Sequence, residues 1–336
     1  MSSTCTCLSS HLPTRRHEKF LRRGNQASRA VARSASTQKE KDTFSRIYGA
    51  LKEQYKEDEV KRVLDSLEFV STGQEYTRFH PSKGLQKASS YISGLLAEPF
   101  HDLDDLNYLW MRKLEENFSD IQGELTSALS NPKLSAVGQH VWVQAARAEA
   151  VAYGPDWKTL VLQDRCVWED TNCALFPKTV ELLKKNGVPS VEVFFAKQAP
   201  NTGIKPHTDN TNFILTSHLG LDVPEGECWM KVGEFKKEWK NGHGMIADTS
   251  FVHSTANESE VKTRYVLIIR FWHPQLTTVE RCALQFLFDA IADPSELGIS
   301  AAVQQARSRQ KKSSECNDKK KRTNSRSLGL LAKGMK

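Results

Sequence analysis

The stretch from Val191 to Leu276 constrains the fold most, because the hydrophobic pattern changes there from a helical period to short apolar runs. Six runs rich in β-branched and aromatic residues alternate with turn sequences such as residues 200–203. Many short strands with this punctuation are typical of a sandwich or barrel, and a cupin-like jelly-roll fits their number. We therefore predict a jelly-roll core at 191–276. The expected strands are Val191–Gln198, Ile204–His207, Phe213–Val223, Cys228–Val232, Gly244–Ala247 and Tyr265–Trp272.

Helical periodicity precedes and follows this stretch, so the expected fold class is α+β with an N-terminal helical region. Residues 40–70 repeat apolar side chains at spacings of three and four, which predicts a pair of amphipathic helices. The polar residues 71–90 are expected to form a loop. Asp104 and Asp105 suit the start of a further helix, whose apolar stripe ends near Leu129. Two more helices are expected at 177–185 and 279–292.

Both ends of the chain are basic, whereas the middle is acidic. Residues 1–37 hold seven Arg or Lys and one acidic residue, a composition that predicts a transit peptide for the chloroplast or, alternatively, the mitochondrion. A plain disordered basic arm is the other interpretation. Residues 306–336 hold eleven Arg or Lys and two acidic residues, which predicts a basic disordered tail. The acidic middle argues against nucleic-acid binding by the folded domain.

The expected domain layout follows from these patterns. The transit peptide at 1–37 precedes a helical hairpin and loop at 38–90, and the main domain spans 91–293. No apolar run is long enough for a membrane span. Seven cysteines without CxxC spacing argue against both a disulfide framework and a thiolate zinc site.

The candidate site residues lie within the expected strands and turns. His207 and Asp209 are two apart, so on a strand both side chains point to one face. His253 can complete a set of two imidazoles and one carboxylate, the ligands typical of non-haem Fe(II) sites with open positions. Asp209 also begins a strong turn sequence, Asp-Asn-Thr-Asn, where an aspartate commonly caps its own turn. Arg264 offers a fork suited to a carboxylate.

The motifs around these residues resemble the aspartyl/asparaginyl β-hydroxylase family. They are PNTGIKPHTDNTNFILTSHLGLDVP, ADTSFVHSTANES and RYVLIIRFWHPQL, and the resemblance covers roughly Tyr91 to Leu276. It implies a double-stranded β-helix that uses Fe(II), O2 and 2-oxoglutarate to hydroxylate an unactivated carbon. By resemblance, His207 and His253 match the iron-binding histidines, Arg264 matches the arginine that holds 2-oxoglutarate, and His218 matches a second cosubstrate contact. No further catalytic residue is expected beyond the metal centre.

Three positions depart from the family pattern. Many relatives have glycine at the position of Asp209, and the family's arginine near HLGL is Thr216 here, while an acidic position before WHP is Arg270. The expected function is a dioxygenase that hydroxylates an unactivated carbon, with a protein Asp or Asn side chain as one candidate substrate. The alternatives are hydroxylation of a lipid or small molecule, and a non-catalytic module that binds 2-oxoglutarate and metal. The sequence does not identify the substrate.

Overall fold

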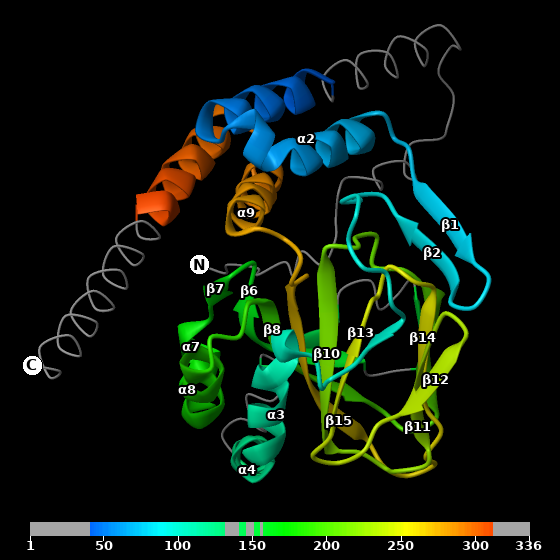
Figure 1. Ribbon diagram of the computed structural model, residues 1–336. Helices are drawn as coiled ribbons and strands as arrows, with labels where there is room; N and C mark the ends of the chain where they lie inside the picture. The colour runs from blue at the N-terminus through cyan, green and yellow to red at the C-terminus, as the bar shows by residue number, and fades with distance from the viewer. Residues whose placement is uncertain (1–40, 132–140, 146–150, 155–156, 312–336) are drawn as a thin grey trace, which may run out of the picture. The chain divides into compact units, whose positions relative to one another are not determined.

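A computed structural model describes residues 41–131, 141–145, 151–154 and 157–311 (Figure 1). The transit peptide expected at 1–37 and residues 312–336 of the expected tail lie outside this described part. Contacts between Cα atoms divide the described chain into two compact units. The larger unit is Thr72–Leu276, and the smaller one combines residues 41–71 with residues 277–311.

The two large antiparallel sheets of the larger unit face each other across an apolar core. One sheet has the order β3-β13-β10-β15-β8-β6-β4, with β7 attached to β6, and the other has the order β12-β11-β14-β9-β5 (Figure 1). This arrangement is a double-stranded β-helix, so the expected α+β class with a jelly-roll core is confirmed. The first sheet comprises β3 (Phe100–His101), β4 (Val143–Gln144), β6 (Lys158–Asp164), β7 (Val167–Trp168), β8 (Ser190–Gln198), β10 (Ile214–Asp222), β13 (Gly244–Ala247) and β15 (Arg264–Trp272). The second comprises β5 (Ala152–Tyr153), β9 (Thr202–His207), β11 (Cys228–Val232), β12 (Phe235–Glu238) and β14 (His253–Asn257).

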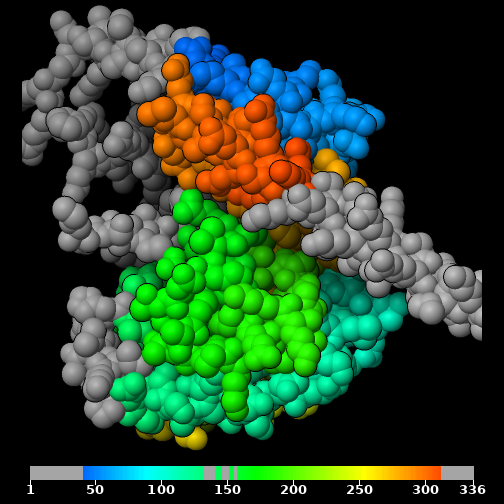
Figure 2. Space-filling view, turned by 90° about the vertical axis from the view of Figure 1, so that its left-hand side faces the viewer, coloured from blue at the N-terminus to red at the C-terminus, as the bar shows by residue number. Residues whose placement is uncertain are grey.

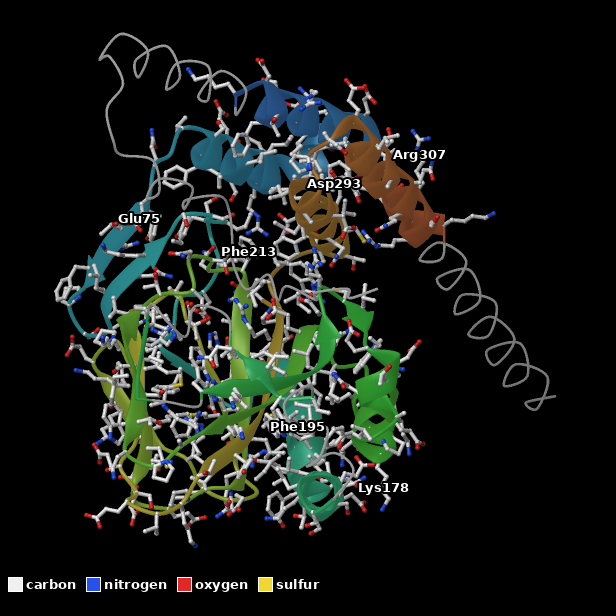
Figure 3. The ribbon with its side chains drawn as sticks, turned by 180° about the vertical axis from the view of Figure 1, so that it is seen from behind. Glu75, Lys178, Phe195, Phe213, Asp293 and Arg307 are labelled. Atoms are coloured by element: carbon white, nitrogen blue, oxygen red, sulfur yellow. The ribbon has the colours of Figure 1, made fainter. Side chains whose placement is uncertain are left out.

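Short helices cover the outer face of the first sheet, which explains why its central strands are apolar on both faces. In β15, Val266 and Ile268 face the core between the sheets, whereas Leu267 and Ile269 face the helix side. Phe195 of β8, labelled in Figure 3, also faces the helices and packs on Phe176 with ring centroids 4.4 Å apart. The helical elements are η1 (Leu106–Tyr108), α3 (Leu109–Glu116), α4 (Phe118–Leu129), α7 (Asp170–Cys173) and α8 (Pro177–Lys185).

The smaller unit consists of helices from both ends of the described chain. Residues 41–54 and α2 (Glu57–Ser71) form the expected amphipathic pair, and α9 (Thr278–Ala292) and residues 296–311 pack with them. Figure 2 shows the two end segments against each other, in blue and orange. Arg62 of α2 donates two hydrogen bonds of 2.7 Å to Glu280 of α9. The C-terminal residues therefore stabilise the N-terminal helices.

The structure differs from the sequence expectations in three segments. Residues 71–90 are not only loop, because β1 (Tyr76–His80) and β2 (Gly84–Ala88) form a hairpin within them. The core extends upstream of residue 191, since β6 pairs with β8. The last helix continues to residue 311, past the expected start of the tail at 306. No helix in the described ranges combines the length and apolar character needed to cross a membrane.

Candidate active site

Two histidines meet on neighbouring strands of the second sheet. His207 ends β9 and His253 begins β14, where the two residues are direct cross-strand partners. Their ring centroids are 4.2 Å apart. Nδ1 of His207 donates to the carbonyl oxygen of Lys205 at 2.8 Å, and Nδ1 of His253 donates to that of Phe251 at 3.0 Å. Because each Nδ1 is held by a carbonyl oxygen, each Nε2 keeps its lone pair for a metal ion.

Asp209 joins the two histidines from a turn. β9 ends at His207, and Asn210 has a left-handed backbone conformation with φ of 65°. The backbone N–H of Asp209 donates to the carbonyl oxygen of Thr249 at 2.9 Å. The possible ligand atoms of His207, Asp209 and His253 all lie within 4.8 Å of one another. Asp209 is therefore a turn residue by its backbone and a member of the cluster by its side chain.

The protonation states of this cluster suit a divalent cation. Burial, with the neighbouring His207 acting in the same direction, lowers the pKa of His253 to about 4. Burial alone would raise the pKa of Asp209, but the charges of Arg270 and the two histidines outweigh it and lower the pKa below its ordinary value. At neutral pH, the His253 imidazole is neutral and Asp209 is a carboxylate.

A cavity of about 120 Å³ between the sheets connects this cluster to Arg264 and His218. Arg264, at the start of β15, is only 1% exposed. Its guanidinium carbon lies 4.2 Å from the ring centroid of Trp239. Nε and Nη1 of Arg264, Nδ1 of His218 and the hydroxyl of Thr255 have no hydrogen-bond partner among the described residues. An anionic ligand would bind most favourably in the part of a cavity where unsatisfied donors surround a buried cation, because it would satisfy those donors.

Burial also sets the charges at this end of the cavity. It lowers the pKa of Arg264 to about 10, which still leaves the guanidinium charged at neutral pH. It lowers the pKa of His218 to about 3, with Arg264 acting in the same direction, so this imidazole is neutral. All five site residues expected from the sequence thus line one cavity.

Several further cavity residues were not expected from the sequence. Glu192 of β8 pairs in register with Arg270 of β15, and both line the cavity together with Asp164 of β6. Glu192 stands alone between Val191 and Val193, and one charge inside an apolar strand is the signal that could have indicated a buried pair. Trp239, which the sequence does not mark as a site residue, supports the Arg264 guanidinium through its ring.

Fold and cavity together define a jelly-roll protein with a cluster of two histidines and one carboxylate beside a buried arginine. Residues 115–274, which lie within the larger unit, match the family model described as aspartyl/asparaginyl beta-hydroxylase. This segment, a little under half of the chain, is therefore similar to the aspartyl/asparaginyl beta-hydroxylase family.

The relatives are longer than this chain. Aspartyl/asparaginyl beta-hydroxylase of Homo sapiens is 27% identical over 214 residues, which cover 62% of this chain and 27% of the human protein. Aspartate beta-hydroxylase domain-containing protein 2 of Xenopus tropicalis is 31% identical over 186 residues, covering 52% of this chain and 47% of that protein. The chain thus spans less than half the length of either relative. A prolyl-4-hydroxylase structure from Pseudomonas putida aligns with a TM-score of 0.29 and 13% identity, over 46% of this chain and 87% of that one.

Proposed function

We propose that this protein is an Fe(II)- and 2-oxoglutarate-dependent dioxygenase that hydroxylates an unactivated carbon. The observation that carries the proposal is the single cavity shared by the His207, Asp209 and His253 cluster and by Arg264. Two imidazoles and one carboxylate with open positions form the ligand set of non-haem Fe(II) oxygenases. The names of the relatives favour an Asp or Asn side chain of a protein as substrate, and a lipid or small molecule is the alternative.

The residues of the cavity fit the two groups that this chemistry requires. Nε2 of each histidine and a carboxylate oxygen of Asp209 would hold Fe(II), while Arg264 and His218 would hold a carboxylate of 2-oxoglutarate. Bound Fe(II) and 2-oxoglutarate together supply the activation of O2 that inserts one oxygen atom into the substrate and converts 2-oxoglutarate to succinate and CO2. The donors of Arg264 and Thr255, which have no partner in the described part of the chain, support this assignment, because a carboxylate would satisfy them.

The chain itself contributes position, charge and exclusion of water. The carbonyl oxygens of Lys205 and Phe251 fix the imidazole orientations. Trp239 fixes the plane of the Arg264 guanidinium. Val161, Phe194 and Ile268 form apolar walls, which keep water from the reacting groups.

Release of succinate from 2-oxoglutarate tests the proposal without a known substrate. With Fe(II), O2 and ascorbate, the purified protein is expected to form succinate slowly, and His253→Ala is expected to lose this activity at least about tenfold, as typical for perturbed metal sites. His243→Ala is the matched control, because His243 is exposed and lies outside the cavity. If 2-oxoglutarate binds but no succinate forms, the protein is a non-catalytic binding module.

The location in the cell is a separate proposal. The Arg- and Ser-rich, acid-poor composition of residues 1–37 supports delivery to the chloroplast, with the mitochondrion as the alternative.

A further inference from the structure

A buried ion pair crosses the first sheet beside the metal-type cluster. Glu192 of β8 and Arg270 of β15 are direct partners in the strand register. Nη1 of Arg270 donates to both carboxylate oxygens of Glu192, at 3.0 and 3.2 Å. Arg270 is 5% exposed and Glu192 is 8% exposed. The guanidinium is thus fixed on one side by a carboxylate of the neighbouring strand.

The other side of the Arg270 guanidinium faces Asp209. Nη2 of Arg270 lies 3.8 Å from Oδ2 of Asp209, whereas Oδ1 of Asp209 lies 3.8 Å from Nε2 of His207. The two oxygens of one carboxylate therefore face different neighbours. This division leaves one oxygen toward the imidazoles, which is the orientation that a single-oxygen metal ligand needs.

From this arrangement we propose that Arg270, anchored by Glu192, is a positioning residue that holds the Asp209 carboxylate in its ligand orientation. The inference rests on the proposed metal site. It gives Arg270 a task separate from that of Arg264, although both arginines line the same cavity. In the strand register, Arg270 of β15 lies directly opposite the uncharged Thr216 of β10. Arg270 therefore supplies the positive charge of this cross-strand pair.

Asp209 needs such support because its own strand does not hold it. The strand ends two residues earlier, and the next residue has a left-handed backbone. The backbone bond to Thr249 fixes where the residue lies, and the Thr249 side chain also hydrogen-bonds the carboxylate. A charge contact from a guanidinium that is itself immobilised by Glu192 adds a second restraint, at Oδ2 of the carboxylate.

A purely structural role does not explain why this buried position holds an ion pair. Exchange of a buried ion pair for apolar residues is often neutral or stabilising, because desolvation of the charges offsets much of their attraction. The adjacent inward positions of β15, Val266 and Ile268, are apolar and serve the core well. A charged residue at position 270 is therefore better explained by its second contact, with Asp209.

A double-mutant cycle on metal affinity tests the inference, with Co(II) as a spectroscopic probe in place of Fe(II). Because Arg270→Gln alone leaves Glu192 unpaired, the Arg270 arm uses the charge-balanced pair Glu192→Gln/Arg270→Gln. This pair is expected to weaken Co(II) binding by about ten- to a hundredfold, the usual effect of outer partners of metal ligands. Asp209→Gly, which removes the ligand itself, is expected to weaken it by a similar factor, because the pair acts only through that carboxylate. The triple variant is expected to be no weaker than the pair. Arg270→Lys, which keeps the charge, is expected to restore part of the affinity.

The direction of the change in Co(II) affinity distinguishes an effect of carboxylate orientation from an effect of charge. Loss of Arg270 alone removes a positive charge near the site and by electrostatics would tighten Co(II) binding, and the charge-balanced pair cancels that contribution. Weaker binding by the pair, with changed Co(II) absorption and an unchanged melting temperature, therefore supports positioning.

Two outcomes overturn the inference while leaving the metal site in place. One is an Asp209→Gly effect of the same size with and without the Glu192–Arg270 pair. The other is an Asp209→Gly variant with unchanged affinity while His253→Ala loses Co(II). If His253→Ala binds Co(II) normally, the proposed function itself fails.

Discussion

Replacement of Arg264 by alanine is expected to raise the 2-oxoglutarate concentration for half-maximal turnover strongly and to leave iron binding largely intact. Loss of one partner of a buried charge pair costs about 2–5 kcal/mol, which is about thirty- to several-thousand-fold in affinity. Arg264 is almost fully buried and remains charged at neutral pH. Its attraction to a carboxylate is therefore little screened by water, and an effect above the lower end of this range is expected.

Thermal unfolding gives a second measure that does not depend on turnover. In the free protein, two guanidinium nitrogens of Arg264 lack hydrogen-bond partners among the described residues, which is a cost to stability. Arg264→Met is therefore expected to keep or raise the melting temperature of the free protein. With Mn(II) replacing iron, 2-oxoglutarate at a hundred times its Kd should stabilise the unsubstituted protein by about 2.7 kcal/mol. The same concentration should hardly stabilise Arg264→Met.

An exposed arginine provides the control for both measurements. Arg78→Ala, on the surface of β1, should leave the 2-oxoglutarate response unchanged. Normal turnover of Arg264→Ala at low 2-oxoglutarate would refute the assignment. Arg270 would then become the candidate for cosubstrate binding, and its proposed role toward Asp209 would have to be abandoned.

Three further predictions concern stability and targeting. Arg62→Ala should destabilise the smaller unit by about 1–3 kcal/mol in urea unfolding, because Glu280 is left buried without its cation; Lys61→Ala, which breaks an exposed pair, should change stability by less than about 1 kcal/mol. Burial raises the pKa of Asp248 from 3.8 to about 7, so ionisation is unfavourable in the folded state and stability should fall as pH rises from about 4 to about 7. Asp248→Asn should flatten this fall, and equal slopes in both proteins would contradict the assignment. A fluorescent fusion of residues 1–45 should enter an organelle, and a diffuse cytosolic signal would reject the targeting prediction.

Elements with a strong hydrophobic periodicity could be predicted from the sequence, and elements without one could not. The helix at Pro177–Lys185 and the strand at Cys228–Val232 have the expected bounds, because punctuation by proline, glycine and polar residues limits them. The strand at Lys158–Asp164 was missed, since a short buried apolar run has no alternation that distinguishes it from a helix segment. The hairpin in residues 71–90 was missed because its first strand is mostly exposed and polar.

The candidate site could be predicted from residue types and their spacing, whereas the contacts across strands could not. His207, His253 and Arg264 could be selected because their chemistry is specific and their motifs occur in order. The pairing of Glu192 with Arg270 depends on the register of β8 against β15, and a shift by one residue would point one of them away. The stacking of Arg264 on Trp239 depends likewise on packing between distant segments.

Asp209 shows how a correct placement can have a different physical cause from the one expected. Strand alternation predicted that Asp209 and His207 share a face, but β9 ends at His207 and alternation no longer applies at residue 209. The turn interpretation and the ligand interpretation are compatible, because the backbone satisfies the first and the side chain is arranged for the second. The carboxylate is consequently restrained by the Thr249 side chain and by Arg270, which belong to other parts of the fold. The ligand role proposed for Asp209 therefore depends on those two residues as well as on the aspartate itself.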